Sequence, residues 1–227
     1  MLQTTLSPID NSIYVERTLA SAAYIDVALD RARIAQRAWR EVSLADRAVI
    51  LNRFCDAFEA KRDEIAAELT WQMGRPSRYA PNEVRGMLER ARHMIQIAPR
   101  ALGDIDVGPK DGFTRFLRRE PLGAVFAIAA WNYPYLIAVN SVVPAIMAGN
   151  AVILKHSAQT PLCAERFEQC FREAGLPDSV FQVLHMSHED TERVVRDPRV
   201  DFVAFTGSVA GGHAIQRAAS RVNCPAE

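Results

Sequence analysis

The stretch from Glu120 to Lys155 constrains the fold more than any other part of the sequence, because it has the pattern of strand, crossover helix and strand. Residues 124–130 form an uninterrupted apolar run, which predicts a strand covered on both faces of a sheet. Pro134 suits the first turn of a helix, and the apolar residues that follow it predict the crossover. Residues 151–155 then predict a second buried strand.

Polar side chains stand where these two strands end. Asn132 follows the first strand closely, and Lys155 is the last residue of the second. Open α/β sheets bind their ligands outside the carboxyl ends of parallel strands. We therefore expect Asn132 and Lys155 to lie in a ligand site.

Helices and strands continue to alternate after Lys155. The predicted elements are a helix over 161–174, a strand over 180–184, a helix opened by Ser187, a strand over 200–205 and a helix to about residue 219. This alternation implies right-handed βαβ units. The predicted fold class is therefore α/β, an open and mostly parallel Rossmann-like sheet with flanking helices.

The first 120 residues have a different character. Residues 1–18 are polar and predict an irregular arm on the surface, and helical periodicity predicts helices over 20–40, 43–73 and 81–99. Residues 113–119 mix apolar and basic side chains, as an exposed or edge strand does. An N-terminal helical region thus precedes the sheet.

Composition excludes several classes of function. Basic and acidic residues balance at 27 each, which argues against nucleic acid or an anionic membrane as partner. No membrane-spanning stretch or signal region is evident. Cys55, Cys163, Cys170 and Cys224 lack the spacing of a disulfide framework or zinc site, so we expect free thiols in a cytoplasmic protein and no bound metal.

A second site-like element spans Phe205 to Gly212. A predicted strand ends, glycines permit a tight turn, and a helix begins with free N–H groups, a geometry that suits a phosphate. Many strand-to-helix turns need glycine only for steric reasons, so the phosphate-binding and the purely structural interpretations both stand on this pattern alone.

Four motifs in order resemble the aldehyde dehydrogenase superfamily. They are Trp131-Asn-Tyr-Pro134, Pro144-Ala-Ile-Met-Ala-Gly-Asn150, Leu154-Lys155 with Gln159-Thr-Pro161, and Phe205-Thr-Gly-Ser208. Ala38-Trp-Arg40 and Gly74-Arg-Pro76 fit as well, so the resemblance covers almost the whole chain. It implies NAD(P)-dependent oxidation of a small-molecule aldehyde to a carboxylic acid, through a thiohemiacetal, hydride transfer and thioester hydrolysis.

The resemblance also assigns roles to residues. Asn132 matches the asparagine whose amide stabilises the developing oxyanion, and Lys155 matches the lysine that contacts the cofactor ribose. The other expected cofactor-binding residues are the lining near the nucleotide and the turn that meets the pyrophosphate: Ile128, Ala129, Ala130, Trp131, Ser157, Phe205, Thr206, Gly207 and Ser208. The purely structural alternatives are a turn-capping asparagine and a surface lysine.

This sequence departs from the family pattern at several positions. Ala130 replaces a proline before the Trp-Asn pair, and Ala158 stands where many members have a glutamate that binds the ribose hydroxyls. His185 and His188 replace a glycine-bearing loop, and a helix-cap region explains them better than a metal half-site does.

The family's catalytic glutamate and nucleophilic cysteine motifs are expected beyond Glu227, and Cys224 lacks the nucleophile's motif. We therefore expect a truncated family member: residues 1–100 as the helical part of the cofactor-binding domain, 101–120 as the start of an oligomerisation arm, and 121–227 as the NAD(P)-binding α/β part. The catalytic domain would be absent and this chain inactive alone, whereas a complete protein would form a homo-oligomer. The alternatives are a non-catalytic cofactor-binding or assembly module and a remnant without function.

Overall fold

The computed structural model describes residues 1–220, and a parallel four-stranded sheet lies at its centre. The strands are β5 (Ala124–Ala129), β6 (Ala151–His156), β7 (Phe181–Val183) and β8 (Phe202–Phe205). Their spatial order is β7-β6-β5-β8, with Ala124 opposite Ala151 and Val125 opposite Phe202. The predicted open, parallel, Rossmann-like sheet is confirmed.

Side chains of the central strands alternate between two hydrophobic cores. On β5, Val125 and Ala127 pack into one core cluster, whereas Phe126 and Ile128 pack into the other. Every residue of β5 and β6 is buried. Burial on both faces explains why these strands are continuous apolar runs rather than alternating ones.

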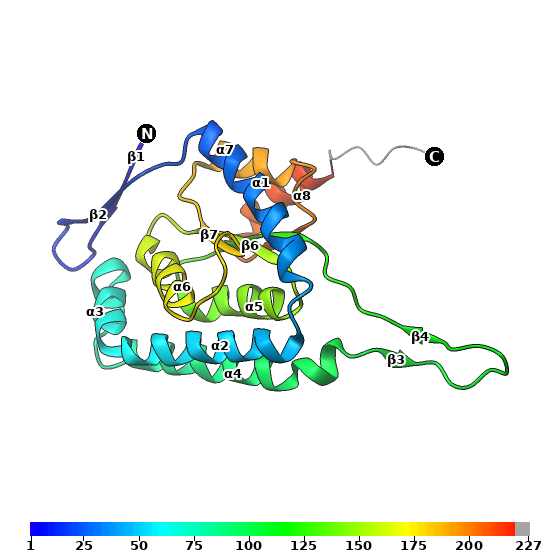
Figure 1. Cartoon of the computed structure of the whole chain (residues 1–227). Coiled ribbons are helices and arrows are strands. Elements are labelled where there is room, and N and C mark those ends of the chain that lie inside the picture. Colours follow the sequence, from blue (N-terminus) through cyan, green and yellow to red (C-terminus); the bar gives the residue numbers. More distant parts are fainter. Residues whose placement is uncertain (221–227) are drawn as a thin grey trace.

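Helices cover both faces of the sheet (Figure 1). One face carries α5 (Pro134–Met147) and α6 (Pro161–Glu173), which in turn pack on α2 (Leu44–Ala60), α3 (Arg62–Met73) and α4 (Ala80–Leu102). The other face carries α1 (Ala22–Trp39), α7 (His188–Val195) and α8 (Val209–Ala219). No helix within residues 1–220 combines the length and the apolar composition needed to cross a membrane.

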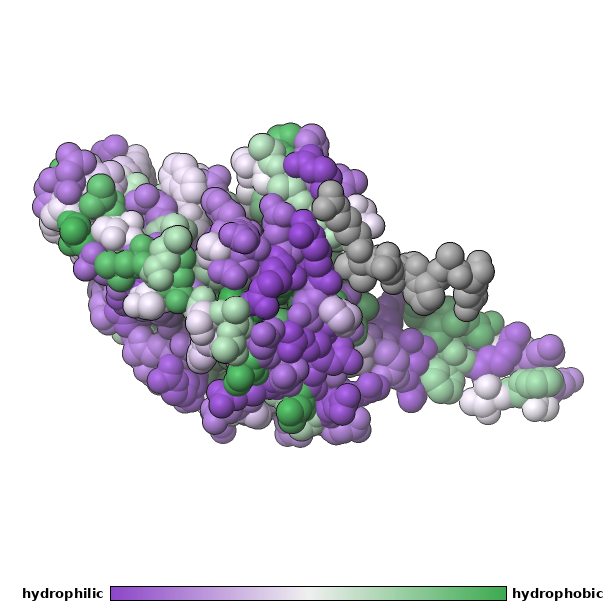
Figure 2. Space-filling view, turned by 90° about the horizontal axis from the view of Figure 1, so that it is seen from above, coloured by the Kyte–Doolittle hydropathy of each residue, from purple (hydrophilic) through white to green (hydrophobic). Residues whose placement is uncertain are grey.

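An arm projects from the body of the molecule between α4 and β5 (Figures 1 and 2). Its strands, β3 (Ile105–Asp106) and β4 (Phe116–Leu117), pair antiparallel over two residues each. The predicted strand over 113–119 is therefore much shorter than expected. Large apolar side chains are exposed along the arm, including Phe113 and Leu117.

The structure corrects three expectations for the N-terminal region. Residues 1–18 are not irregular but form an antiparallel hairpin of β1 (Leu2–Leu6) and β2 (Ile13–Thr18). Its side chains are fixed by contacts with residues distant in the sequence, such as the stacking of Tyr14 on Trp71 at 5.9 Å between ring centroids. Local sequence patterns carry no information on such contacts, which is why they do not predict the hairpin.

The predicted helix over 43–73 is two helices, because Lys61 leaves helical geometry between α2 and α3. There its ammonium pairs with Glu173 of α6 at 2.6 Å, a tertiary contact with no local signal. Helix α4 continues past Pro99, which lies in the last turn, where one missing N–H removes only one helical hydrogen bond. Gly74 ends α3 in the left-handed conformation.

Candidate functional site

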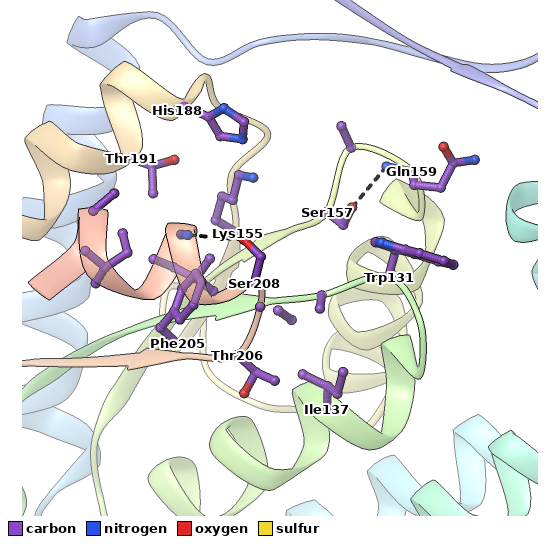
Figure 3. Close-up of a pocket in the computed structure, with 18 of the residues that line it drawn as sticks. Trp131, Ile137, Lys155, Ser157, Gln159, His188, Thr191, Phe205, Thr206 and Ser208 are labelled. Carbon is purple, nitrogen blue, oxygen red and sulfur yellow. Dashed lines mark hydrogen bonds between the residues drawn. The ribbon is translucent and has the colours of Figure 1, made fainter.

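All of the sequence-predicted site residues line one pocket of about 1000 Å³ at the carboxyl ends of β5, β6 and β8 (Figure 3). They are Ile128, Ala129, Ala130, Trp131, Asn132, Lys155, Ser157, Phe205, Thr206, Gly207 and Ser208. Parallel strands place their carboxyl ends at one edge of the sheet, so residues far apart in the sequence meet there.

Arg75 supports the turn that carries Asn132. The Arg75 guanidinium donates from Nη2 to the Asn132 carbonyl at 2.8 Å and lies over the Tyr133 ring, 4.6 Å from its centroid. The same nitrogen is 2.9 Å from Glu83 Oε2. Since Asn132 is bound through its main chain, its side-chain amide stays available at the pocket wall.

Glu83 anchors the helix that follows this turn. Its side chain is fully buried, and it accepts a hydrogen bond from the Tyr135 N–H in the first turn of α5 at 3.0 Å. Burial raises the pKa of Glu83, and the neighbouring Arg75 partly offsets that effect. A carboxylate at a helix N-terminus binds N–H groups that lack partners within the helix.

Lys155 is the penultimate residue of β6, one residue before the predicted strand's observed end at His156; it is only 8% exposed and lines the pocket. Within residues 1–220 its ammonium has no hydrogen bond or ion pair, and burial alone lowers its pKa. Figure 3 shows the side chain extending toward the part of the pocket where His188 lies. A largely buried lysine without a protein partner is uncommon, and here it places a cation at the wall of the pocket.

His156, the residue after Lys155, ties the two central loops together. Burial lowers the pKa of His156 to about 4, so its ring is neutral. Its Nδ1 accepts from the Ser157 N–H at 2.9 Å, which assigns the proton to Nε2 and makes that nitrogen the donor to the Pro134 carbonyl at 3.2 Å. The end of β6 is thereby bound to the start of α5.

The turn after β8 combines a helix cap with a glycine in close contact with an aromatic ring. Ser208 caps α8 by accepting from the Gly211 N–H at 3.1 Å, and the first N–H groups of the helix remain free of intrahelical partners. A β-carbon on Gly207 would lie 2.6 Å from the Phe205 ring, so any other residue there would require the ring or the turn to shift.

Several lining residues were not predicted as site residues: Ile137, Gln159, His188, Thr191, Glu192, Gly211, Ala214 and Ile215, with Ala158 considered only as a departure from the family pattern. Most lie on α7 and α8, which form one wall of the pocket. Gly211 and Gln159 belong to motifs singled out in the sequence, and His188 was considered only as a departure from the family pattern. The remaining residues carry no local sequence signal, because tertiary packing decides which face of each helix lines the pocket.

No cysteine among the described residues belongs to the pocket. Cys55, Cys163 and Cys170 are free and buried. Burial raises the pKa of Cys55 to about 11 and that of Cys170 to about 12, and it raises the pKa of Cys163 as well. Cys224 lies outside the described residues. Residues 1–220 contain no cluster of three or more potential metal ligands, so His185 and His188 do not belong to such a cluster there.

Similarity to known proteins extends over almost the whole chain. The family described as "Aldehyde dehydrogenase family" matches residues 3–225. The chain is 34% identical over 214 residues to a succinate-semialdehyde dehydrogenase [NADP(+)] of Mycobacterium avium, covering 93% of this chain and 45% of that protein. It is 36% identical over 211 residues to a 3,6-anhydro-alpha-L-galactose dehydrogenase of Streptomyces coelicolor, covering 92% and 43%.

Solved structures of aldehyde dehydrogenases are similar to this chain as well. An NAD-dependent aldehyde dehydrogenase from Sinorhizobium meliloti superimposes with a TM-score of 0.92 at 32% identity, covering 97% of this chain and 45% of that one. A succinic semialdehyde dehydrogenase from Streptococcus pyogenes, solved with NADP+, gives 0.91 at 26% identity, covering 97% and 48%. The chain spans about half the length of the relatives it matches, as the sequence predicts. The chain belongs to the aldehyde dehydrogenase family.

Proposed function

We propose that the pocket binds NAD or NADP, and that this chain is the cofactor-binding part of an NAD(P)-dependent aldehyde dehydrogenase. The observation that carries the proposal is Lys155, a largely buried lysine whose ammonium has no partner within residues 1–220 and which lines the same pocket as the glycine turn at Gly207 and Ser208. A dinucleotide has ribose hydroxyls and a pyrophosphate, and these groups match a buried cation and free helix N–H groups.

In the proposed complex, Lys155 and Ser157 hold the adenosine ribose, and the turn at Gly207 and Ser208 meets the pyrophosphate. The backbone of Ala129 and Ala130 and the side chain of Trp131 line the part of the pocket that leads toward the nicotinamide end of the cofactor. Asn132 points an amide donor at the developing oxyanion of the substrate. When bound, the cofactor's nicotinamide ring accepts the two electrons of aldehyde oxidation.

For the whole protein we propose oxidation of a small-molecule aldehyde to a carboxylic acid, in a cytoplasmic homo-oligomer that uses the arm at β3 and β4. Support for the arm comes from its exposed apolar residues Phe113, Phe116 and Leu117. Two relatives are named for succinate semialdehyde and for an anhydro sugar, both carbonyl compounds.

A second candidate is a non-catalytic cofactor-binding or assembly module. It is favoured by the buried state of the cysteines that the structure describes, since none of them reaches the pocket. Cofactor binding without aldehyde turnover by the purified 227-residue chain is expected for both candidates, and it would separate them from a remnant without function.

Calorimetric titration of NAD and NADP into the purified chain tests the cofactor proposal. Lys155→Met should weaken both nucleotides by about tenfold or more, as expected for the loss of a charge-assisted hydrogen bond. Lys110→Met, at an exposed position on the arm, is the matched control and should bind as the unaltered chain does. Equal affinity of Lys155→Met and Lys110→Met would refute the assignment of the pocket.

A further inference from the structure

The N-terminal hairpin reaches the pocket loop from the far end of the sequence. Thr5, on β1, is 2% exposed, and its hydroxyl donates to the carbonyl of Ala158 at 2.7 Å. The next residue of the hairpin, Leu6, offers its carbonyl to the Gln159 side-chain amide at 3.3 Å. Ala158 and Gln159 both line the pocket, whereas Thr5 and Leu6 do not.

A second set of contacts fixes the other strand of the hairpin. Arg17, on β2, donates to both carboxylate oxygens of Glu165 on α6, at 2.7 and 2.8 Å. The same carboxylate lies 3.0 Å from His185 Nε2, just after β7. The Ala20 N–H donates to the His185 carbonyl at 2.8 Å. The hairpin therefore binds to the segments that follow both β6 and β7, at the edge of the sheet where the pocket opens.

The loop that receives the Thr5 hydroxyl has little regular structure of its own. Residues 157–160 lie between β6 and α6, and their local hydrogen bonds are the short-range ones of a turn. Gln72, fully buried on α3, holds the end of this loop through its contacts with Gln159 and the Leu162 N–H. Thr5 supplies the bond to the Ala158 carbonyl, in the part of the loop nearest Lys155.

We infer that the N-terminal hairpin is a positioning element of the nucleotide site, in which the Thr5 hydroxyl sets the place of the Ser157–Gln159 backbone against the adenosine end of the cofactor. This inference rests on the proposed cofactor binding. Thr5 does not touch the ligand. It acts through the Ala158 carbonyl, so its loss should affect the adenosine half of the dinucleotide and leave unaffected the nicotinamide half, which in the proposed complex would lie toward Asn132.

The test compares Thr5→Val with Thr4→Val in the 227-residue chain. Valine has the shape of threonine without the hydroxyl, and Thr4 is the exposed neighbour on the same strand, whose hydroxyl donates to the Glu16 carboxylate. Thr5→Val should weaken AMP and NAD by about threefold to tenfold and leave nicotinamide mononucleotide unchanged. Thr4→Val should leave all three affinities unchanged, and Thr5→Ser, which keeps the hydroxyl, should restore AMP binding.

Amide hydrogen exchange gives a readout that needs no ligand. The Ala158 and Gln159 amides should exchange faster in Thr5→Val than in Thr4→Val. If the unaltered chain bound nucleotide, and Thr5→Val matched it in AMP affinity and loop exchange, the positioning role alone would be overturned. If the unaltered chain bound no nucleotide while the loop amides of Thr5→Val exchanged faster, the proposed cofactor would be wrong and the effect of Thr5 on the loop would stand.

Discussion

The buried carboxylate of Glu83 accepts a hydrogen bond from the Tyr135 N–H at 3.0 Å, which ties α4 to the first turn of α5. Because the same carboxylate pairs with Arg75, and Arg75 donates to the Asn132 carbonyl, one buried ion pair supports the whole turn before α5. The turn is thus positioned by residues that lie some fifty residues earlier in the chain.

Removing one member of this buried pair should destabilise the fold strongly. Glu83→Ala leaves the Arg75 guanidinium and the Tyr135 N–H without their partner, and we expect the free energy of unfolding to fall by about 3 kcal/mol. Glu89→Ala, on the same helix with a side chain that is 72% exposed, should change it by less than about 0.5 kcal/mol. Urea unfolding of both variants measures these changes. Equal losses in the free energy of unfolding would show that the Arg75–Glu83 pair contributes no more to stability than an exposed side chain does.

Aldehyde oxidation by this chain is expected to be absent. Thiolate attack must precede electron transfer in the family reaction, and Cys55, Cys163 and Cys170 are buried with raised pKa values and lie outside the pocket. Absorbance at the reduced-cofactor band should stay flat when aldehyde and NAD or NADP are added. Turnover that Asn132→Ala abolishes and Cys224→Ala leaves intact would show that the nucleophile is elsewhere.

The residue at position 158 should set the choice between NAD and NADP. A carboxylate there would accept hydrogen bonds from the ribose hydroxyls and repel a 2′-phosphate, whereas Ala158 does neither and the nearby Lys155 would attract a phosphate. We expect the chain to tolerate NADP, and Ala158→Glu to shift the affinity ratio toward NAD by about tenfold. Titration of both nucleotides measures this ratio. Strong NAD selectivity in the unaltered chain that the glutamate does not change would place discrimination elsewhere.

Acid should remove the stabilisation that Glu165 provides. Burial opposes its charge, but hydrogen bonds from His185 and Arg17 prevail and lower the pKa of Glu165 to about 2. A lowered carboxyl pKa stabilises the fold above the ordinary value of 4.5, and this contribution is lost as the pH falls from there toward about 2.

Glu165→Gln should therefore melt at a lower temperature than the unaltered chain at pH 6, and the difference should shrink toward pH 2. Glu168→Gln, on the same helix with a looser 3.7 Å pair to Arg172, is the matched control and should follow the unaltered chain throughout. Thermal melts across this range would contradict the linkage if the Glu165→Gln difference stayed constant.

The edge of the sheet at β8 should promote self-association. Within residues 1–220, β8 pairs only with β5, and Phe202 on this strand is 49% exposed. The free backbone N–H and C=O groups of an unpaired strand edge, together with an exposed aromatic side chain, favour association with another chain. Sedimentation should show association that grows with concentration and is reduced in Phe202→Lys. A monodisperse monomer at high concentration would count against this.

The sequence by itself determined the sheet and most of its ligand edge. Residues 124–130 and 151–155 are apolar without interruption because both faces of β5 and β6 are buried, and this signal is local. Asn132, Lys155 and Ser208 were placed at strand ends by the same local patterns, and the pocket brings them together.

Only the tertiary structure decided which distant residues support that edge. Thr5 bonds Ala158 across 153 positions, Arg75 and Glu83 hold the turn at Asn132, and Lys61 breaks a helix where it pairs with Glu173. Each of these contacts depends on how packed helices and the hairpin lie against one another, not on the periodicity of any one segment. Hydrophobic patterning specifies which face of an element is buried, whereas a buried polar side chain finds its partner only after the elements have packed.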